Sequence, residues 1–243
     1  MKTTPRLHLE APLSAGSEIN LSREQGHYLT SVLRLSSGDA LRAFNGRDGE
    51  WLAYLATVSK KSVTLRCERR VAEAKLPPDI DYVFAPLKHA RLDYVVQKAT
   101  ELGAASITPL LAERSVLKLK GERADKKRAH WQAIAIAACE QCGRNRVPVV
   151  AAAVDLAGWL EANAKAAPMQ RLLLSLHSAS VPIGNFQGAA APAVFLSGPE
   201  GGLSPAEEDA ALAQGFSPVT LGRRVLRAET AALAALARMA QDA

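Results

Sequence analysis

The first segment that could do chemistry is a glycine-rich stretch, Leu196-Ser-Gly-Pro-Glu-Gly-Gly-Leu-Ser204. It follows an apolar run and precedes a helix start, which is where parallel sheets bind ligands. Gly198, Gly201 and Gly202 permit positive φ values and let a ligand approach the backbone closely. Neither Gly-Lys-Ser/Thr nor Gly-x-Gly-x-x-Gly is present, which argues against a triphosphate or a dinucleotide. A nucleotide-like ligand and an ordinary strand-to-helix turn fit this pattern equally well.

A second segment, Leu221-Gly-Arg-Arg-Val-Leu-Arg-Ala-Glu-Thr-Ala231, places three arginines between a strand end and an Ala-rich helix. Arg227 and Glu229 are close together where the loop joins the helix, and negative charge is favoured near a helix start. The pair is either part of a reactive site or an ion-paired helix start. Spacing alone favours the second interpretation.

The cysteines and histidines indicate less. Cys139-Glu-Gln-Cys142 has C-x-x-C spacing, but it ends a long helix, whereas a thioredoxin-type pair begins one. A zinc site needs more ligands than this pair and Cys67 supply, so we expect no metal. The histidines have no Gly-x-Ser-x-Gly motif beside them. His177 ends an apolar run, where a lone histidine is more often structural than a ligand contact.

Two patterns of secondary structure must position these segments. Residues 1–75 contain short expected strands at 40–44, 50–58 and 62–71, separated by turn clusters. A helix is expected after Ser22, because Gln25 stands at the spacing of a capping box. This region predicts a small, mostly β barrel, and Pro77-Pro78 marks the boundary that follows it.

From Ile80 onward, expected strands and helices alternate, which predicts an α/β domain with a largely parallel sheet. Asp155 and Ser204 are the expected N-caps of two further helices. The sequence thus predicts two domains, residues 1–75 and residues 76–243. The remaining expected strands lie at 82–86, 106–111, 147–152, 172–176, 194–196 and 218–221, and the remaining helices at 91–102, 123–142 and 228–239.

Composition and charge narrow the class of protein. Hydrophobic residues make up 48% and charged residues 22%, which is typical of a globular chain and not of disorder. Lys and Arg outnumber Asp and Glu by 24 to 16 in residues 1–150, but number 6 against 8 in residues 151–243. Such a bias favours nucleic acid as partner, although a solvated basic surface fits equally. The apolar runs are too short for a membrane span. Few cysteines and no secretory pattern at the start favour the cytoplasm.

Taken together, these motifs carry a resemblance over nearly the whole chain. The sequence resembles the bacterial small-subunit ribosomal RNA uracil-N3 methyltransferases, the RsmE family of the SPOUT superfamily. Several long motifs in the right order are more specific than any single glycine loop. One small departure is Ala228, where relatives often have Thr. The motifs are His27–Leu35 with Gly38-Asp39, Gln97–Gly103, Ile107–Pro109, Glu113–Ser115, Ala138–Pro148, Gly198–Gly202 and Leu221–Thr230.

The resemblance implies a fold, a reaction and a set of binding residues. The fold would be a PUA-like RNA-binding barrel followed by a SPOUT α/β methyltransferase domain with a C-terminal trefoil knot, in a homodimer. The cofactor would be S-adenosylmethionine, and the substrate one uridine of 16S ribosomal RNA in the small ribosomal subunit, uridine 1498 by analogy with the family. The implied cofactor-binding residues are Leu176, His177, Leu196, Gly198, Glu200, Gly201, Gly202, Leu221, Gly222, Val225, Leu226 and Arg227.

The chemistry of that reaction suggests roles for the second segment. A sulfonium methyl is already activated, so the enzyme must mainly align it with the attacking nitrogen. Uracil N3 becomes a good nucleophile only as it loses its proton, and it must be unpaired or flipped out to react. We expect Glu229 to be the base and Arg227 to stabilise the developing anion. Glu200 is an alternative carboxylate for either role.

The excess positive charge before residue 150 suggests which residues contact RNA phosphates. The expected RNA contacts are Arg6, Arg34, Lys88, Arg114, Arg144 and Arg146.

Two other functions stay open. One is a ribose 2′-O-methyltransferase of the same superfamily, and the other is a non-catalytic RNA-binding module that retains the fold.

Overall fold

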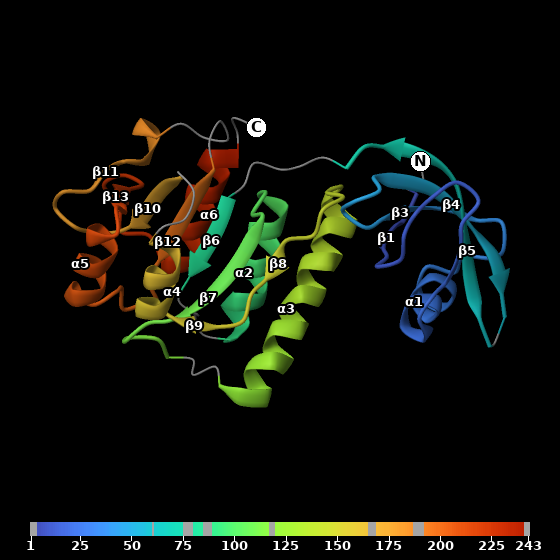
Figure 1. The fold of residues 1–243 in the computed structure, drawn as a ribbon, viewed down its shortest axis with the longest axis horizontal. Helices are drawn as coiled ribbons and strands as arrows, with labels where there is room; N and C mark the ends of the chain where they lie inside the picture. The colour runs from blue at the N-terminus through green and yellow to red at the C-terminus, as the bar shows by residue number, and fades with distance from the viewer. Residues whose placement is uncertain are drawn as a thin grey trace. The chain divides into compact units, whose positions relative to one another are not determined.

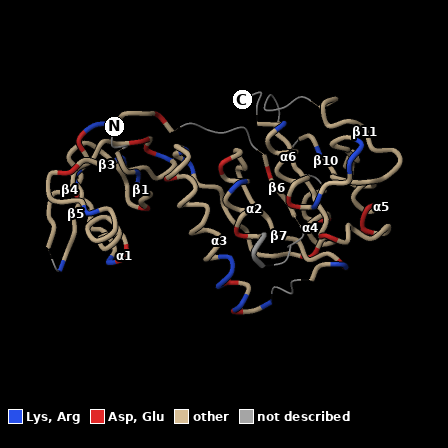
Figure 2. Tube along the Cα trace, turned by 180° about the vertical axis from the view of Figure 1, so that it is seen from behind, with Lys and Arg blue, Asp and Glu red and all other residues tan. Residues whose placement is uncertain are grey.

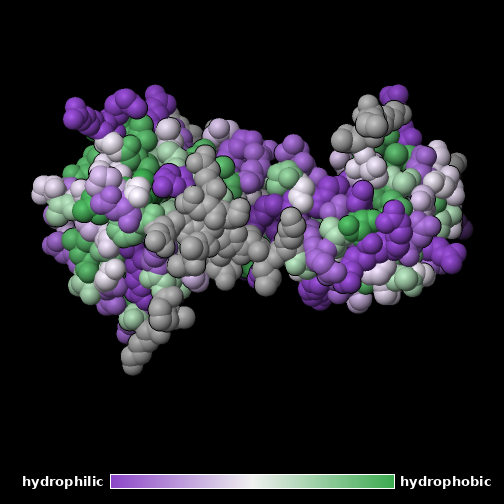
Figure 3. All heavy atoms as spheres, turned by 90° about the horizontal axis from the view of Figure 1, so that it is seen from above, coloured by the Kyte–Doolittle hydropathy of each residue, from purple (hydrophilic) through white to green (hydrophobic). Residues whose placement is uncertain are grey.

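The computed structural model of the protein describes residues 4–59, 61–74, 80–84, 89–116, 120–164, 169–186 and 192–240 (Figure 1). The chain forms two compact units. One consists of residues 1–76 with residues 139–147, and the other of residues 77–138 with residues 148–243. On the face seen in Figure 3, each unit exposes hydrophobic residues scattered among hydrophilic ones, as protein surfaces commonly do.

The first unit is built on a mixed, mostly antiparallel sheet. Its strands follow the order β1 (Arg6–His8), β3 (Ala40–Phe44), β4 (Glu50–Val58), β5 (Val63–Ala72) and β2 (Glu18–Asn20). Only the pairing of β1 with β3 is parallel among these strands. Alternate residues of the strands point to one face, where Leu41, Ala53, Leu55 and Leu65 form a core.

The helical segment of the first unit covers part of that core. Helix α1 (Arg23–His27) begins at Ser22, whose hydroxyl accepts from the backbone N–H of Gln25 while the Gln25 side chain accepts from that of Ser22. The expected capping box is therefore confirmed. The helix widens into a π-helical turn, η1 (Tyr28–Val32), which buries Leu29 completely. Arg34 follows with a φ of 57°, an unusual value for a residue other than glycine.

Residues 139–147 join the first unit through polar contacts with β1. Arg6 pairs with Glu50 at 3.3 Å and lies over the Phe44 ring, 4.4 Å from its centroid. Its guanidinium also donates to the backbone carbonyls of Cys139 and, at 3.0 Å, Arg144. These carbonyls belong to the last turn of a long helix and the loop after it, which explains why this segment clusters with a sheet far away in sequence.

The second unit contains a parallel sheet. Its order is β11 (Val181–Pro182), β13 (Ser217–Thr220), β10 (Gln170–Leu174), β12 (Ala193–Ser197), β6 (Ile80–Phe84), β7 (Ser106–Leu111) and β8 (Val149–Val150), and β9 (Val154–Asp155) also pairs with β7. All of these pairings are parallel. Every residue of β12 is buried, as its apolar sequence predicts for a strand covered on both faces.

Helices cover the two faces of this sheet. Helices α4 (Leu156–Asn163) and α5 (Pro205–Ala213) pack on each other, and α2 (His89–Glu101) packs on α6 (Ala228–Ala240). Side chains of α4 and α5 share a core with Val83, Leu173 and Val194, so the alternate strand residues face the opposite side. The long helix α3 (Gly121–Cys142) and the short η2 (Ile183–Asn185) complete the described helices. None of the described helices is long and apolar enough to span a membrane.

The C-terminal strand and helix follow an unusual path. Strand β13 is inserted between β10 and β11, whereas the helix that follows it, α6, packs against α2. Residues 221–227 therefore pass the ends of β10 and β12 on their way to α6.

Three expected strands differ from the structure. Strand β10 covers residues 170–174 and not 172–176, so Leu176 lies beyond its end. Strand β6 covers residues 80–84 and not 82–86, and residues 85–88 lie outside the described part of the chain. Strand β8 keeps only Val149 and Val150 of the expected segment 147–152. Pro148 has no backbone N–H for a sheet ladder, which explains the late start.

Candidate functional site

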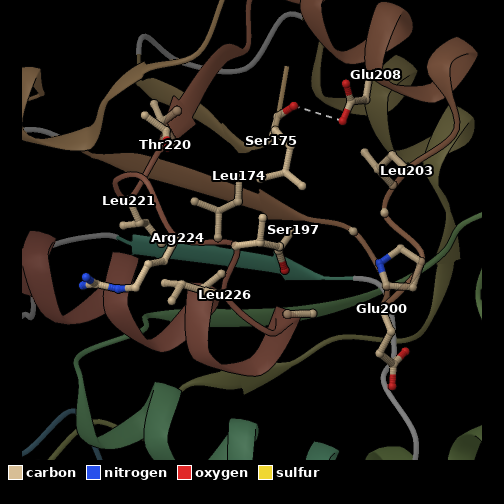
Figure 4. A pocket seen from close by; sticks show the side chains of 18 residues that line it. Leu174, Ser175, Ser197, Glu200, Leu203, Glu208, Thr220, Leu221, Arg224 and Leu226 are labelled. Carbon is tan, nitrogen blue, oxygen red and sulfur yellow. Dashed lines mark hydrogen bonds between the residues drawn. The ribbon is translucent and has the colours of Figure 1, made fainter. Parts of the chain in front are cut away.

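A pocket lies where the carboxyl ends of β10, β12 and β13 meet (Figure 4). Three chain segments form its wall: the end of β10, the glycine-rich loop after β12, and the arginine-containing loop after β13. Helix α5 contributes one residue and helix α6 two. The lining residues are Leu174, Ser175, Leu176, Ser197, Gly198, Pro199, Glu200, Gly202, Leu203, Glu208, Val219, Thr220, Leu221, Arg224, Val225, Leu226, Ala228 and Ala231.

Most of the pocket wall is apolar. Leu174, Leu203, Leu221 and Leu226 come from all three segments and surround the same space in Figure 4. Leu176 and Val225 also line the pocket, and each exposes 76% of its surface to solvent. An apolar lining with a few polar groups is typical of pockets that bind a small organic molecule or a cofactor.

Two hydroxyl groups meet near the end of β12. The Ser197 hydroxyl is 3.2 Å from that of Tyr82, which comes from the neighbouring strand β6. Burial raises the pKa of Tyr82 far above its usual value, and its hydrogen bond with Ser197 opposes this only in part. The phenol is therefore neutral at physiological pH, so this pair donates and accepts hydrogen bonds but supplies no charge.

A carboxylate on α5 gives the pocket its oriented negative group. The Ser175 hydroxyl donates to Oε1 of Glu208 at 3.0 Å, and the same hydroxyl oxygen accepts from the backbone N–H of His177 at 2.9 Å. A second carboxylate, Glu200, is exposed on the glycine-rich loop. Arg224 lines the opposite segment, but its guanidinium points away from the other labelled side chains (Figure 4). The pocket thus combines apolar walls with acidic groups.

The glycine-rich loop is tightly folded at Gly198. A Cβ atom at this position would lie 2.8 Å from the backbone nitrogen of Leu203, which no neighbour can relieve without a backbone shift. Gly202 has a φ of +70°, a value that favours glycine. At Gly201, a Cβ atom would meet only side-chain carbons of Arg114 at 3.6 Å, which is an ordinary contact. Gly198 and Gly202, and not Gly201, are the glycines that shape the pocket.

The structure gathers only some of the residues that the resemblance implies for the cofactor. Those that line the pocket are Leu176, Gly198, Glu200, Gly202, Leu221, Val225 and Leu226. Those that do not are His177, Leu196, Gly201, Gly222 and Arg227. Leu196 is fully buried in the core, and His177 is exposed and accepts from the Ala179 N–H.

The expected reactive pair lies beside the pocket. Ala228 and Ala231 both line it, because residues three apart on a helix share a face. Arg227 and Glu229 flank Ala228 and line no part of it. Arg227 is exposed, and Glu229 is half-buried in the first turn of α6.

Several lining residues were not expected from the sequence. Leu174, Ser175, Val219 and Thr220 are at strand ends, where the sequence carries no glycine or charge signal, and the expected cap at Ser204 would place Glu208 in a first helical turn. The others belong to the two quoted segments, in which neither glycine nor the Arg227 and Glu229 pair marks them. The unexpected residues are Leu174, Ser175, Ser197, Pro199, Leu203, Glu208, Val219, Thr220, Arg224, Ala228 and Ala231.

The six expected RNA contacts lie in different surroundings. Arg34 is exposed, and Arg146 is half-buried. Arg6 is engaged inside the first unit, with its side chain 12% exposed. Burial lowers the pKa of the half-buried Arg144. Arg114 donates hydrogen bonds to backbone carbonyls of the glycine-rich loop, and Lys88 lies outside the described residues.

The three cysteines differ in their exposure to solvent. Cys67 and Cys139 are buried and Cys142 is exposed, and burial raises the pKa of Cys139 to about 12. Within the described ranges, no group of three or more His, Cys, Asp or Glu side chains is placed to hold a metal ion.

Comparison with known proteins defines the class. A family model described as an RNA methyltransferase domain matches residues 74–240, and one described as an RNA methyltransferase PUA domain matches residues 21–67. Together with the parallel sheet and the pocket at the carboxyl ends of its strands, these matches define an RNA methyltransferase with the SPOUT fold, preceded by a PUA-type unit.

Curated relatives define the family within that class. A ribosomal RNA small subunit methyltransferase E from Buchnera aphidicola (subsp. Acyrthosiphon pisum) is 30% identical, over 97% of this chain and 92% of the relative. The protein of the same name from Synechocystis is 34% identical, over 91% and 72%. The chain belongs to the ribosomal RNA small subunit methyltransferase E family.

Solved structures agree with this assignment. A ribosomal RNA small subunit methyltransferase E from Neisseria gonorrhoeae, bound to S-adenosyl methionine, superposes with a TM-score of 0.88 at 34% identity, over 97% of this chain and 96% of the other. A putative methyltransferase from Legionella pneumophila, also in complex with this cofactor, gives 0.89 at 36% identity over the same shares.

Proposed function

We propose that this protein transfers the methyl group of S-adenosylmethionine to N3 of one specific uridine in 16S ribosomal RNA of the small ribosomal subunit. The observation that carries the proposal is the pocket at the carboxyl ends of β10, β12 and β13, in a chain whose Neisseria and Legionella relatives were solved with this cofactor. The activity belongs to ribosomal RNA processing and ribosome biogenesis.

The residues of the pocket fit S-adenosylmethionine. Its adenine requires apolar walls, which Leu174, Leu203 and Leu226 supply. At Gly198, which also lines the pocket, the absence of a Cβ lets the loop pack closely on the backbone of Leu203. The sulfonium and ammonium groups of the cofactor are positive, and Glu208 places a carboxylate in the same pocket.

The bound cofactor supplies an activated methyl group, so the protein must position the uracil and remove the proton from its N3. We assign proton removal to Glu229 and stabilisation of the developing uracil anion to Arg227. Both residues flank Ala228, which lines the pocket. Glu200 is the alternative carboxylate, since it lies on the exposed side of the same pocket.

The first unit is proposed to hold the RNA. The match to a PUA-type domain supports this role for the domain of residues 1–75, with the methyltransferase domain at residues 76–243. Tyr28 and Val32 are 40% and 59% exposed on η1, and Arg34 follows them. An exposed aromatic ring and an exposed guanidinium on one short segment suit contacts with an unpaired base and its phosphate. Basic residues also cluster on the first turns of α3 in the second unit (Figure 2).

We also propose a homodimer that works in the cytoplasm. The support for a dimer is the family resemblance, together with the exposure of Leu176 and Val225 at the pocket, which a second copy would cover. Sedimentation of the purified protein tests this assembly.

The decisive experiment supplies purified protein and isotope-labelled S-adenosylmethionine to small ribosomal subunits from a deletion strain. Nucleoside mass spectrometry should recover the label as N3-methyluridine at a single position. Recovery only as a 2′-O-methyl nucleoside would identify a ribose methyltransferase. Absence of cofactor binding by calorimetry, with RNA binding retained, would identify a non-catalytic RNA-binding module.

A further inference from the structure

The glycine-rich loop needs restraint from outside itself. Gly198, Gly201 and Gly202 lie within five residues, and glycine loses more conformational freedom on ordering than any other residue. A loop that is ordered only when ligand binds would use part of the binding energy for that ordering. The groups that hold the free loop in place therefore influence how tightly the pocket binds.

Arg114, from the turn that follows β7, makes direct hydrogen bonds to this loop. Its Nη1 donates to the carbonyl oxygen of Gly201 at 2.9 Å and to that of Leu203 at 3.2 Å. The Cβ and Cδ atoms of Arg114 also lie against Gly201, on the side where a glycine Cβ would be. Leu203 lines the pocket, so the second of these bonds acts on a residue that shapes the binding space.

Glu207, on α5, connects the start of this helix to the same turn after β7. Its Oε2 accepts from the backbone N–H of Ser204 at 2.8 Å, as part of the capping box. Its Oε1 accepts from the backbone N–H of Glu113 at 2.8 Å. One carboxylate thus joins the start of α5, directly after the glycine-rich loop, to the residue that precedes Arg114.

The turn at residues 112–115, which carries these contacts, is held together by its own hydrogen bonds. The backbone N–H of Ala112 donates to the Ser115 hydroxyl, and that of Ser115 donates to the Ala112 carbonyl, each at 3.0 Å. Residues 112–115 are therefore a short, hydrogen-bonded turn at the end of the buried strand β7. They form a fixed support for the glycine-rich loop.

We infer that Arg114 and Glu207 are positioning residues that hold the glycine-rich loop in its cofactor-binding shape, and that Arg114 acts there and not as an RNA contact. This inference rests on the proposed binding of S-adenosylmethionine in the pocket. It changes the role that positive charge alone suggests for Arg114. Neither residue touches the reacting atoms, so their effect is on cofactor affinity.

The test compares cofactor and RNA binding by full-length variants. Arg114→Ala should weaken S-adenosylmethionine binding by about tenfold in calorimetry, since two hydrogen bonds to the loop are lost. Arg114→Lys should recover part of this loss, because an ammonium group reaches a carbonyl but lacks the fork of a guanidinium. Glu207→Gln, which keeps one oxygen acceptor, should fall between the parent and Arg114→Ala.

A kinetic measurement separates positioning from a general loss of structure. With subunits as substrate, Arg114→Ala should raise KM for the cofactor and leave kcat at saturating cofactor nearly unchanged. Arg128→Ala is the matched control for cofactor affinity alone, because Arg128 is exposed on α3, its loss removes the same charge, and it belongs to the basic cluster proposed for RNA and not to the pocket. The control should leave cofactor affinity at the parent value, and thermal melting should verify that each variant is folded.

The outcomes distinguish this inference from the proposed function. If Arg114→Ala binds the cofactor like the parent but binds RNA more weakly, with a smaller salt dependence, Arg114 is a phosphate contact and the inference is wrong. If the parent itself binds no S-adenosylmethionine, the proposed function is wrong. Weaker cofactor binding with unchanged RNA binding supports the inference.

Discussion

Ser175 donates a 3.0 Å hydrogen bond to Glu208 and so links the end of β10 to the first turn of α5 at the pocket wall. The two residues are 33 positions apart, and neither belongs to the glycine-rich or the arginine-containing segment. The bond fixes the direction of a carboxylate in a largely apolar pocket, where a charge interacts more strongly with its partner than in water. The ligand of this pocket should therefore carry a positive charge.

Glu208→Gln tests this expectation, because it keeps the hydrogen bond with Ser175 and removes the charge. We expect S-adenosylmethionine to bind about tenfold more weakly, as for the loss of one charge-assisted contact. S-adenosylhomocysteine lacks the sulfonium charge, so the ratio of the two affinities shows which positive group Glu208 meets. Glu161→Gln, on the exposed side of α4, is the control. Equal affinities of parent and Glu208→Gln would place the carboxylate away from the cofactor's charges.

Alanine at Gly198 should weaken cofactor binding strongly, whereas alanine at Gly201 should change it little. Gly198→Ala puts a Cβ 2.8 Å from a backbone nitrogen, so the loop must shift, and cofactor affinity should fall by more than about tenfold. Gly201→Ala makes only 3.6 Å contacts with Arg114 and should bind within about twofold of the parent. Titration calorimetry measures both. A larger loss at Gly201 than at Gly198 would contradict this account of the pocket.

Arg227 and Glu229 should affect turnover more than binding. If they act on the developing uracil anion, Arg227→Ala and Glu229→Ala should lower the single-turnover rate by about a hundredfold or more at saturating cofactor. Cofactor affinity should change little, because neither residue lines the pocket. Variants that lose only cofactor affinity would assign both residues to binding.

The RNA surface should depend on Arg34 and Tyr28. Arg34→Ala should lower RNA affinity and reduce the slope of log affinity against log salt by about 0.7, as expected for one single-stranded phosphate contact. Tyr28→Ala should lower affinity with little change in that slope, since stacking on a base involves no counterion. Fluorescence anisotropy at several salt concentrations distinguishes the two, and an unchanged affinity in both variants would remove η1 from the interface.

Arg6→Ala, in contrast, should act on stability. Arg6 pairs with Glu50 and bonds the carbonyls of Cys139 and Arg144, and breaking a largely buried pair on one side costs about 3 kcal/mol. Chemical denaturation should show this loss. A stable Arg6→Ala variant with weaker RNA binding would restore Arg6 as an RNA contact.

Alkaline pH should destabilise the protein through Cys139. Burial raises the pKa of this thiol to about 12 in the folded protein, above its ordinary value of 9.0. Because the unfolded chain loses the proton first, the free energy of unfolding should fall as pH rises from 9.0 towards about 12. Cys139→Ala should show a weaker fall in urea denaturation over this range. In the native protein near pH 8, iodoacetamide should modify exposed Cys142 and spare Cys139, and equal rates at both would contradict the burial.

Local signals in the sequence were sufficient for most elements. The Ser204 box with Pro205 predicts the start of α5, and the apolar run at 194–196 predicts a strand buried on both faces, because caps and periodicity act over a few residues. Strands β2, β9 and β11 were not expected. Each has two or three residues, too few for alternation to be visible, and only pairing with a distant strand makes them strands.

By itself, the sequence determined the alternating fold class, the family, and two of the three segments that form the pocket. Glycine and arginine clusters stand out along the chain wherever they lie. Only the tertiary structure added Ser175 and Glu208, and only it turned Arg114 from a surface charge into a support of a loop 87 residues away. The physical reason is that burial and hydrogen-bond partners are set by contacts between distant segments, whereas composition and spacing report only what is near in the chain.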